Sequence, residues 1–401
     1  MLPSRPDLPT SLSALVLTLC VSGCIMPDNG PLTAIGKPAE SSVDPFVTAA
    51  AFDMQQVFRG ERYPNIVVGI DGTVLALWGN SSVRVRRSGD GGETWGPAIT
   101  IAKPGFQGGG ATVDETTGKI FAFVEDGHPP APLTVHCSED HGKTWQAIDS
   151  VIHKDPLGNM PSMHMNESGI TLRHGPYAGR LIRPARHYAG GNKHSEWPNH
   201  YTTAIYSDNG GQAWHTSAPF PENGTGEAAI IELSDGRLYY NSRVHWEKRP
   251  NNTRRRCAWS SDGGQTWKDW QLIEVLPDGR QDRSYGCMGG LTRLPVRGRD
   301  ILLFSNLDTQ SKQREKITVW GSFDGGKTWP VKRMVFDGPS GYSSMTAGRP
   351  NTPSEGWVYL QFEGGPGGGS QVARFNLKWL LEGTVTGNGS LPDWLADRGS
   401  R

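Results

Sequence analysis

The 401-residue chain lacks net charge, contains few cysteines and shows no long helical pattern. Its 40 basic and 40 acidic side chains cancel, which excludes a partner held mainly by charge, such as nucleic acid. Five cysteines occur, and the spacing of Cys137, Cys257 and Cys287 in the body of the chain fits no CxxC metal pattern. Because three cysteines cannot all pair with one another, we expect buried thiols. No HExxH motif is present, so we expect no metal and no cofactor.

Long apolar runs are also missing, except near the N-terminus. Residues 11–21 (SLSALVLTLCV) form an apolar run too short to span a bilayer, which is typical of a secretory signal peptide over residues 1–23. The following Ser-Gly-Cys resembles the lipobox of bacterial lipoproteins and implies a lipid on Cys24; an unmodified cysteine after ordinary signal cleavage is the alternative. Residues 24–50 are rich in Pro, Ser and Ala and are interpreted as a tether. We expect an exported, membrane-anchored lipoprotein that faces the periplasm or the cell exterior.

Glycine, proline and tryptophan are plentiful, with 52, 29 and 14 residues, which indicates many turns and short strands. One turn sequence recurs five times, as SGDGGETW, SEDHGKTW, SDNGGQAW, SSDGGQTW and SFDGGKTW. Its third residue falls at intervals of 50, 69, 53 and 62 residues, which is the signature of a repeat architecture. These third residues are Asp90, Asp140, Asn209, Asp262 and Asp324.

The turn has a structural explanation. Its Ser and Asp side chains can bond backbone amides in a tight bend, and its glycines accept positive φ. Flanking segments such as VRVRRS alternate as strands do. We therefore predict an all-β fold, a six-bladed β-propeller over residues 51–380, with residues 381–401 as a tail. We expect the Trp of each repeat on the outside of its blade, and we assign the repeated acidic residues no catalytic role.

The repeats resemble the Asp-boxes, or BNR repeats, of sialidases, and the resemblance extends unevenly over residues 55–375. It implies an exo-α-sialidase-like retaining glycoside hydrolase that releases terminal sialic acid, or a related 2-keto sugar acid, from glycans. Such a site holds the substrate carboxylate with three arginines, which offer paired donors and stay charged. A tyrosine acts as nucleophile, and a glutamate takes its proton.

Two motifs place the first members of that site. Arg62-Tyr63-Pro64 stands where the family has Arg-Ile-Pro, so Arg62 would be the first carboxylate-binding arginine. Residues 223–243 (NGTGEAAIIELSDGRLYYNSR) resemble the segment that supplies the general base and the second arginine, here Glu227 and Arg243.

The C-terminal motifs supply the rest. Arg314, shortly before the last repeat, takes the position of the third arginine. Tyr342 in GPSGYSSMT falls on the nucleophile, and Glu363 in LQFEGG falls on the glutamate that orients the first arginine. Because a phenol is a weak nucleophile at neutral pH, we expect Glu227 within hydrogen-bond distance of Tyr342.

One element of the family pattern is absent. The loop that carries the family's general acid, an Asp, corresponds to residues 76–88 (ALWGNSSVRVRRS), which contain no Asp or Glu. The general acid therefore stays unassigned, with Asp126, Asp282 and His128 as weak candidates from other loops.

The segment 180–207 is dense in aromatic, histidine and arginine side chains, which suit a glycan-contacting rim. Its candidates are Arg186, His187, His200 and Tyr201. Two alternatives to a sialidase stay open: an enzyme of the same fold acting on another acidic sugar, as a uronate hydrolase or lyase, and a non-catalytic glycan-binding propeller. We expect sialylated or other acidic glycans as partners, and a monomer.

Overall fold

The computed structural model describes residues 40–396, except 249–252, 281–282 and 284–285. The predicted signal peptide, the lipidation site Cys24 and the candidate acid Asp282 lie outside the described residues. The described residues belong to one compact unit that spans residues 35–401.

Nearly all regular structure is antiparallel β-sheet, because the chain consists of short apolar or alternating segments separated by Gly-rich turns. Two sheets contain four strands in chain order: β2 (Asn65–Val68), β3 (Val74–Trp78), β4 (Val83–Ser88) and β5 (Ile99–Ala102), then β6 (Phe106–Val113), β7 (Ile120–Glu125), β8 (Leu133–Ser138) and β9 (Gln146–Ile148). A third is formed by β15 (Thr225–Glu232), β16 (Leu238–Val244), β17 (Arg254–Ser260) and β18 (Lys268–Pro277).

The other two sheets are larger. One follows the order β10-β14-β13-β12-β11, with β10 (Val151–Ile152), β11 (Ile170–Thr171), β12 (Leu181–His187), β13 (Tyr201–Ser207) and β14 (Ala213–Thr216). The eight-stranded sheet follows the order β1-β24-β23-β22-β21-β20-β19, and β25 pairs with β22. Its strands are β1 (Phe52–Phe58), β19 (Leu291–Arg293), β20 (Leu302–Leu307), β21 (Glu315–Ser322), β22 (Val331–Ala347), β23 (Val358–Gly364), β24 (Ser370–Phe375) and β25 (Thr384–Val385).

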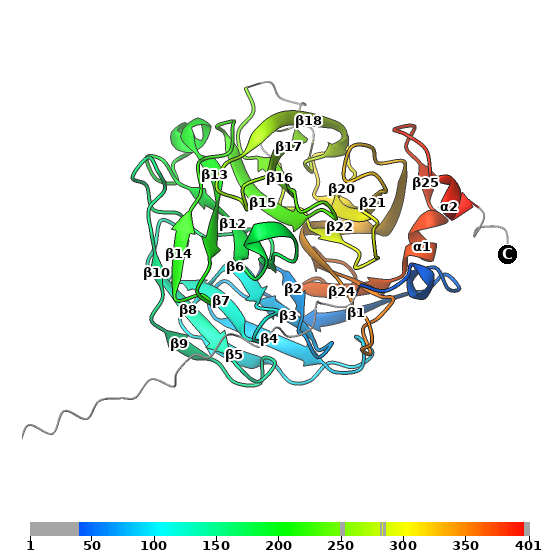
Figure 1. The fold of residues 1–401 in the computed structure, drawn as a ribbon, viewed down its shortest axis with the longest axis horizontal. Coiled ribbons are helices and arrows are strands. Elements are labelled where there is room, and N and C mark those ends of the chain that lie inside the picture. The colour runs from blue at the N-terminus through cyan, green and yellow to red at the C-terminus, as the bar shows by residue number, and fades with distance from the viewer. Residues whose placement is uncertain (1–39, 249–252, 281–282, 284–285, 397–401) are drawn as a thin grey trace, which may run out of the picture. The chain divides into compact units, whose positions relative to one another are not determined.

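The long strand β22 joins two separate ladders within that sheet. Its first half, as far as Pro339, pairs with β21, and its second half, from Ser340 onward, pairs with β23. The N-terminal strand β1 pairs with β24, so the last ladder contains strands from both ends of the described chain. Figure 1 shows the sheets arranged around a common centre.

Helices are few and short. The α-helices are α1 (Leu377–Leu381) and α2 (Asp393–Ala396), and the 3₁₀-helices are η1 (Asp44–Phe46), η2 (Gly175–Tyr177) and η3 (His194–Asn199). No helix in the described ranges is long and apolar enough to cross a bilayer. The prediction of an all-β fold is therefore confirmed.

Each repeated turn connects the third and fourth strands of a ladder, and its hydrogen bonds are local. In the first copy Ser88 Oγ donates to Asp90 Oδ1 (2.7 Å), and the backbone N–H of Thr94 donates to the same oxygen (3.0 Å). The hydroxyl of Thr94 donates to Asp90 Oδ2 (2.5 Å), so both carboxylate oxygens are engaged within the turn. The glycine at the fifth position has φ between 80° and 87° in every copy, which favours Gly: Gly92, Gly142, Gly211, Gly264 and Gly326.

The third copy shows what the Asp and Thr contribute. Asn209 Oδ1 still accepts bonds from the hydroxyl of Ser207 and the backbone N–H of Ala213. Because Ala213 has no hydroxyl, the bond that the Thr hydroxyl donates to the Asp carboxylate in the other copies is absent. The turn forms without it.

The repeat tryptophans are packed rather than exposed. Trp214, Trp267 and Trp329 are buried, while Trp95 and Trp145 are half-buried. Trp329 packs in an apolar cluster with residues of two neighbouring sheets, including Tyr239. Burial between sheets removes most of the large indole surface from water, which stabilises each inter-sheet contact.

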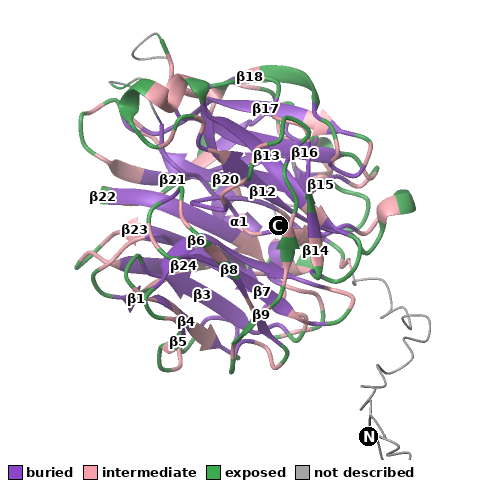
Figure 2. Ribbon diagram, turned by 90° about the vertical axis from the view of Figure 1, so that its left-hand side faces the viewer, coloured by how far each residue is buried: buried purple, intermediate pink, exposed green. Residues whose placement is uncertain are grey.

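The ends of the folded body differ from the expected boundaries. Glu40 pairs with Arg293 (2.9 Å), and Phe46 is 1% exposed, so the last part of the expected tether packs on the body. Within the expected tail, β25 pairs with β22. Figure 2 shows that buried residues follow the strands, whereas exposed residues concentrate in the connections.

Candidate active site

Tyr342 is surrounded by the three predicted arginines. The guanidinium carbons of Arg62, Arg243 and Arg314 lie 5.1, 5.9 and 4.9 Å from the centre of its ring. Tyr342 itself is only 9% exposed. Because three like charges repel one another, this arrangement favours an anion or a phenolate between them.

These four residues come from three different sheets or their connections. Arg62 precedes β2, Arg243 lies near the end of β16, Arg314 precedes β21, and Tyr342 lies in the second half of β22. Their meeting therefore depends on how the sheets pack around the centre, since no two of them are neighbours in the sequence.

Glu363 on β23 holds Arg62 in place. Its two carboxylate oxygens accept hydrogen bonds from Arg62 Nε and Nη2, each at 3.0 Å. The same carboxylate accepts bonds from the backbone N–H groups of Tyr63 (3.2 Å) and Tyr342 (3.3 Å). The Arg62 side chain remains 43% exposed, so its guanidinium is oriented by Glu363 while part of it faces solvent.

Glu227 on β15 is buried between two guanidinium groups. Its side chain is 3% exposed, contacts Arg243 Nη1 directly and lies 3.5 Å from Arg186 Nη1. Burial alone raises the pKa of Glu227, but Arg243 and Arg186 outweigh it and hold the pKa below the usual 4.5. Glu227 is therefore an ionised carboxylate at neutral pH.

The expected direct hydrogen bond between Glu227 and Tyr342 does not occur among the described contacts. Instead Arg243 Nη1 lies between them, in contact with Glu227 and 3.4 Å from Tyr342 Oη. The guanidinium attracts the carboxylate more strongly than a neutral phenol does, because that hydrogen bond is charged on both sides. Glu227 and Tyr342 therefore both contact Arg243 rather than each other.

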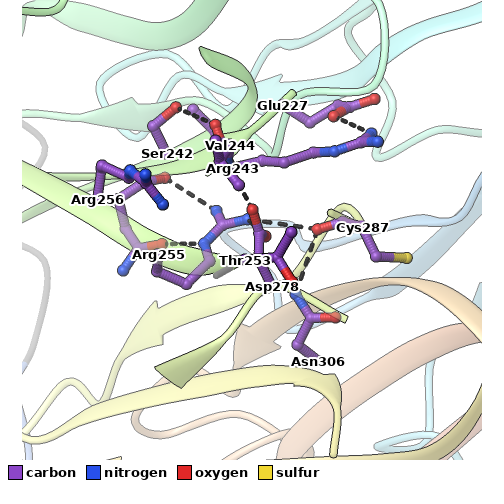
Figure 3. Close-up of polar contacts among 12 residues, drawn as sticks. Glu227, Ser242, Arg243, Val244, Thr253, Arg255, Arg256, Asp278, Cys287 and Asn306 are labelled. Carbon is purple, nitrogen blue, oxygen red and sulfur yellow. Dashed lines mark hydrogen bonds and ion pairs between the residues drawn. The ribbon is translucent and has the colours of Figure 1, made fainter. Parts of the chain in front are cut away.

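A buried polar network beneath Arg243 was not predicted from the sequence. Asp278 accepts bonds from the backbone N–H of Val244 (2.5 Å) and from Arg255 Nη1 (2.7 Å), and both charged side chains are fully buried (Figure 3). Arg255 also donates to the carbonyl of Cys287 (3.3 Å), which links the start of β17 to the segment before β19. No sequence motif predicts the ion pair between Asp278 and Arg255, because the two residues come from separate segments.

The three thiols take no part in this network. Cys137, Cys257 and Cys287 are free and buried, as expected. Burial raises the pKa of the Cys287 thiol to about 11, although Arg314 and Arg243 oppose the effect, so the group stays protonated.

Aromatic rings form one side of the site, here called the aromatic wall: Tyr63, Phe106, His128, His164 and Tyr188. Tyr63 stacks on Tyr342 with ring centres 6.1 Å apart. Its backbone has φ 79°, a conformation that costs an aromatic residue about 1–3 kcal/mol. Burial raises the pKa of Tyr63 to about 12, against the effect of Arg62, so it remains a neutral phenol.

The predicted glycan-contacting rim is largely wrong. Arg186 and His200 are 1% and 0% exposed, and Arg186 lies 3.5 Å from Glu227. Arg186 Nη2 lies 3.2 Å from His200 Nδ1 and 2.6 Å from His245 Nδ1. Strand β12 is buried over six of its seven residues, so it does not follow the alternation of a half-exposed strand.

Two other rim candidates lie away from the arginines. Tyr201 is 5% exposed, and its hydroxyl donates to Asp155 (2.5 Å) while accepting from Asn159 (2.7 Å). His187 packs on Tyr201 and places its Nδ1 3.0 Å from the carbonyl of Met160. Both make local structural contacts.

Glu61 binds the backbone of the loop in which the family's general acid would lie. Its carboxylate accepts bonds from the backbone N–H groups of Asn80 (2.9 Å) and Ser81 (3.3 Å) and pairs with Arg84 (3.1 Å). Asp126, one weak candidate, is an exposed residue directly after β7. Neither is placed beside Tyr342 by any contact in the described part of the chain.

A separate cavity of about 400 Å³ lies at the opposite ends of the inner strands, lined by Val68, Ile230 and Ala347 among others. Three of its charged groups pair with one another: Glu115 binds both Arg173 (2.8 Å) and Arg349 (2.6 Å). None of the predicted site residues lines it. Across the described ranges no three His, Cys, Asp or Glu side chains are grouped as a metal ion would require.

Comparisons with known proteins identify the family of the chain. Residues 72–352 match the BNR repeat-like domain family. The chain is 30% identical over 443 aligned positions to a sialidase of Micromonospora viridifaciens, an alignment that covers 100% of this chain and 64% of that protein. The chain therefore spans less than two thirds of that relative's length.

Solved structures share the fold. The Hadza microbial sialidase Hz136 has a TM-score of 0.59 at 23% identity, covering 80% of this chain and 66% of that one. The intramolecular trans-sialidase of Ruminococcus gnavus has a TM-score of 0.58 at 16% identity, covering 88% and 99%. The solved structures at this identity show the shared fold. The family model matched over residues 72–352 and the relative aligned along the whole of this chain show that the chain belongs to the sialidase family with BNR repeats.

Proposed function

We propose that this protein is an exo-acting retaining sialidase that releases terminal sialic acid, or a related 2-keto sugar acid, from glycans. The observation that carries the proposal is the convergence of three guanidinium groups on Tyr342, with the ionised Glu227 beside them. Three arginines match the charge and shape of a carboxylate attached at the anomeric carbon. A site for carboxylate binding alone has no need of a phenol at its centre.

In the proposed reaction, the arginines hold the substrate carboxylate and Tyr342 attacks the anomeric carbon. Glu227 takes the phenolic proton, which requires Arg243 to release part of its contact when the substrate carboxylate arrives. A phenol approaches an anionic substrate with less repulsion than a carboxylate nucleophile would. Glu363 orients Arg62 and, through the backbone N–H, the strand that carries Tyr342.

We also propose that the ladders form the six blades of a β-propeller, with the eight-stranded sheet contributing two of them through the long strand β22. Five blades carry the repeated turn, and the sixth is formed with β1. We propose further that the protein is exported, anchored by a lipid on Cys24, and acts as a monomer on sialylated or other acidic glycans.

The test is incubation of the full chain with a fluorogenic α-sialoside and with sialyllactose, followed by proton NMR of the released sugar. Release of the α-anomer first would support a retaining sialidase. Release of the β-anomer first would contradict the tyrosyl intermediate. A protein that leaves sialosides intact but forms unsaturated uronate from an acidic polysaccharide would be a lyase, an alternative that the missing acidic side chain in residues 76–88 favours.

A further inference from the structure

A departing sugar oxygen needs a proton, and the described carboxylates around Tyr342 have other partners. Glu227 lies between two arginines, and Glu363 binds Arg62 through both oxygens. Glu61 holds the short loop after β3. Burial opposes ionisation of Glu227, but Arg243 and Arg186 outweigh it and hold its pKa below 4.5, which makes Glu227 a poor proton donor. Both oxygens of Glu363 are occupied by Arg62.

Glu125 is a carboxyl group that burial holds protonated, but it is shielded from the site. Burial raises the pKa of Glu125 to about 8, and hydrogen bonds from Ser162 and Met163 oppose this only in part. Its side chain accepts from Ser162 Oγ at 2.6 Å and is 1% exposed. A sugar oxygen in the pocket cannot reach it.

The aromatic wall brings two histidines toward the site. Ring centres are separated by 6.1 Å between Tyr342 and Tyr63, by 5.5 Å between Tyr63 and His164, and by 4.7 Å between His164 and His128. Neither histidine pairs with a carboxylate among the described residues. His164 is 4% exposed, whereas His128 is exposed at the end of the wall.

We propose that His128 delivers the proton to the departing sugar oxygen, an inference that rests on the proposed glycosidase function. The Nδ1 atom of His128 lies 3.0 Å from the carbonyl of Pro129 and 3.2 Å from the side-chain nitrogen of Asn192. In the imidazolium form, Nδ1–H donates to the Pro129 carbonyl. The proton on Nε2 is then the one available for transfer.

The step balances with the residues present. As the Tyr342 oxygen bonds to the anomeric carbon, its proton passes to Glu227. The bond from that carbon to the leaving oxygen breaks, and the oxygen takes the Nε2 proton of His128. Neutral His128 then accepts a proton from the water that cleaves the tyrosyl bond, and Glu227 returns its proton to Tyr342.

The groups that face His128 set its pH range. Phe106, His164 and Tyr188 pack against its ring. Partial burial and Arg186 lower the pKa of His128 below the usual 6.5, while the Pro129 carbonyl and Glu227 raise it. Since the acid must be protonated, its contribution is lost as pH rises through a value below 6.5.

Comparing the rates on two substrates tests proton donation separately from the other steps of the reaction. A fluorogenic aryl sialoside has a leaving group that departs without protonation, whereas sialyllactose has a poor one. For His128→Gln we expect a loss of about 10²–10⁴-fold in kcat/KM on sialyllactose and less than about 5-fold on the aryl sialoside. The alkaline limb of the sialyllactose pH profile should also disappear.

The matched control is His187→Gln, because His187 likewise places Nδ1 3.0 Å from a backbone carbonyl and makes no hydrogen bond or ring contact with Arg62, Arg243 or Arg314 among the described residues. It should leave both substrates unaffected. Equal losses on both substrates in His128→Gln would overturn the inference and indicate a structural role. The selective loss appearing in Asp126→Asn or Asp282→Asn instead would also overturn it. A wild-type protein that cleaves neither sialoside would overturn the proposed function, and this inference with it.

Discussion

Replacing Tyr342 with phenylalanine removes one oxygen from the centre of the candidate site and leaves the ring in place. The Oη atom makes one hydrogen bond among the described residues, from Arg243 at 3.4 Å. A bond that long contributes little, so we expect the free energy of unfolding to change by less than about 1 kcal/mol. The ring keeps its contacts with the three guanidinium groups, which lie 4.9–5.9 Å from its centre.

Turnover should respond very differently from stability. Without the phenol no tyrosyl intermediate can form, while Glu227 and the arginines stay in place. We expect kcat on an aryl sialoside to fall by at least about 10³-fold, which corresponds to about 4 kcal/mol of activation free energy. The affinity for a sialic acid analogue should stay within about 5-fold, because the carboxylate contacts come from the arginines.

The assay combines steady-state turnover, calorimetric binding of the analogue and thermal unfolding on the same preparation. Tyr206→Phe is the matched control, since the Tyr206 ring also lies near a guanidinium, 4.3 Å from that of Arg180, but outside the site. It should keep full turnover. Hydrolysis by the Tyr342 variant within 10-fold of wild type would refute the nucleophile assignment, and lost analogue binding would show that the phenol serves binding instead.

Three further predictions concern other parts of the chain. Glu363→Gln keeps the shape of the carboxyl group but removes the charge that orients the part-exposed Arg62, so analogue binding should weaken about 10-fold in calorimetry while folding is retained. The double substitution Asn209→Asp with Ala213→Thr supplies the hydrogen bond that the third repeat lacks and should stabilise the protein by about 0.5–1.5 kcal/mol in chemical denaturation; destabilisation would contradict the structural role of the repeat. Mass spectrometry of the exported protein should find a lipid on Cys24, and an unmodified N-terminus downstream of it would rule the anchor out.

The repeated turns could be predicted from the sequence because their physics is local. In the first copy, Ser88, Asp90 and Thr94 bond to one another within eight residues, so the pattern specifies the bend wherever it occurs. The segments between such bends, with alternating or continuous apolar residues, specify strands because this pattern also depends only on nearby residues. The all-β fold follows from these two signals.

The candidate site is a mixed case. The motifs identified Arg62, Arg243, Arg314 and Tyr342, and the structure brings them together. The sequence did not predict that Arg243 lies between Glu227 and Tyr342. That geometry depends on competition between a charged and a neutral acceptor for one guanidinium, which only the folded site decides.

Long-range packing decided the remaining features. Arg62 and Glu363 are 301 residues apart, and they pair only because β23 lies beside the start of β2. The sequence predicts Arg186 as a surface side chain, because a charged residue on a strand is normally exposed, but Arg186 is buried. It is buried because Glu227, from the adjacent sheet, lies 3.5 Å away and compensates its charge. A motif records which residues are present in a segment, whereas the partners of a buried charge depend on which segments the fold places against it.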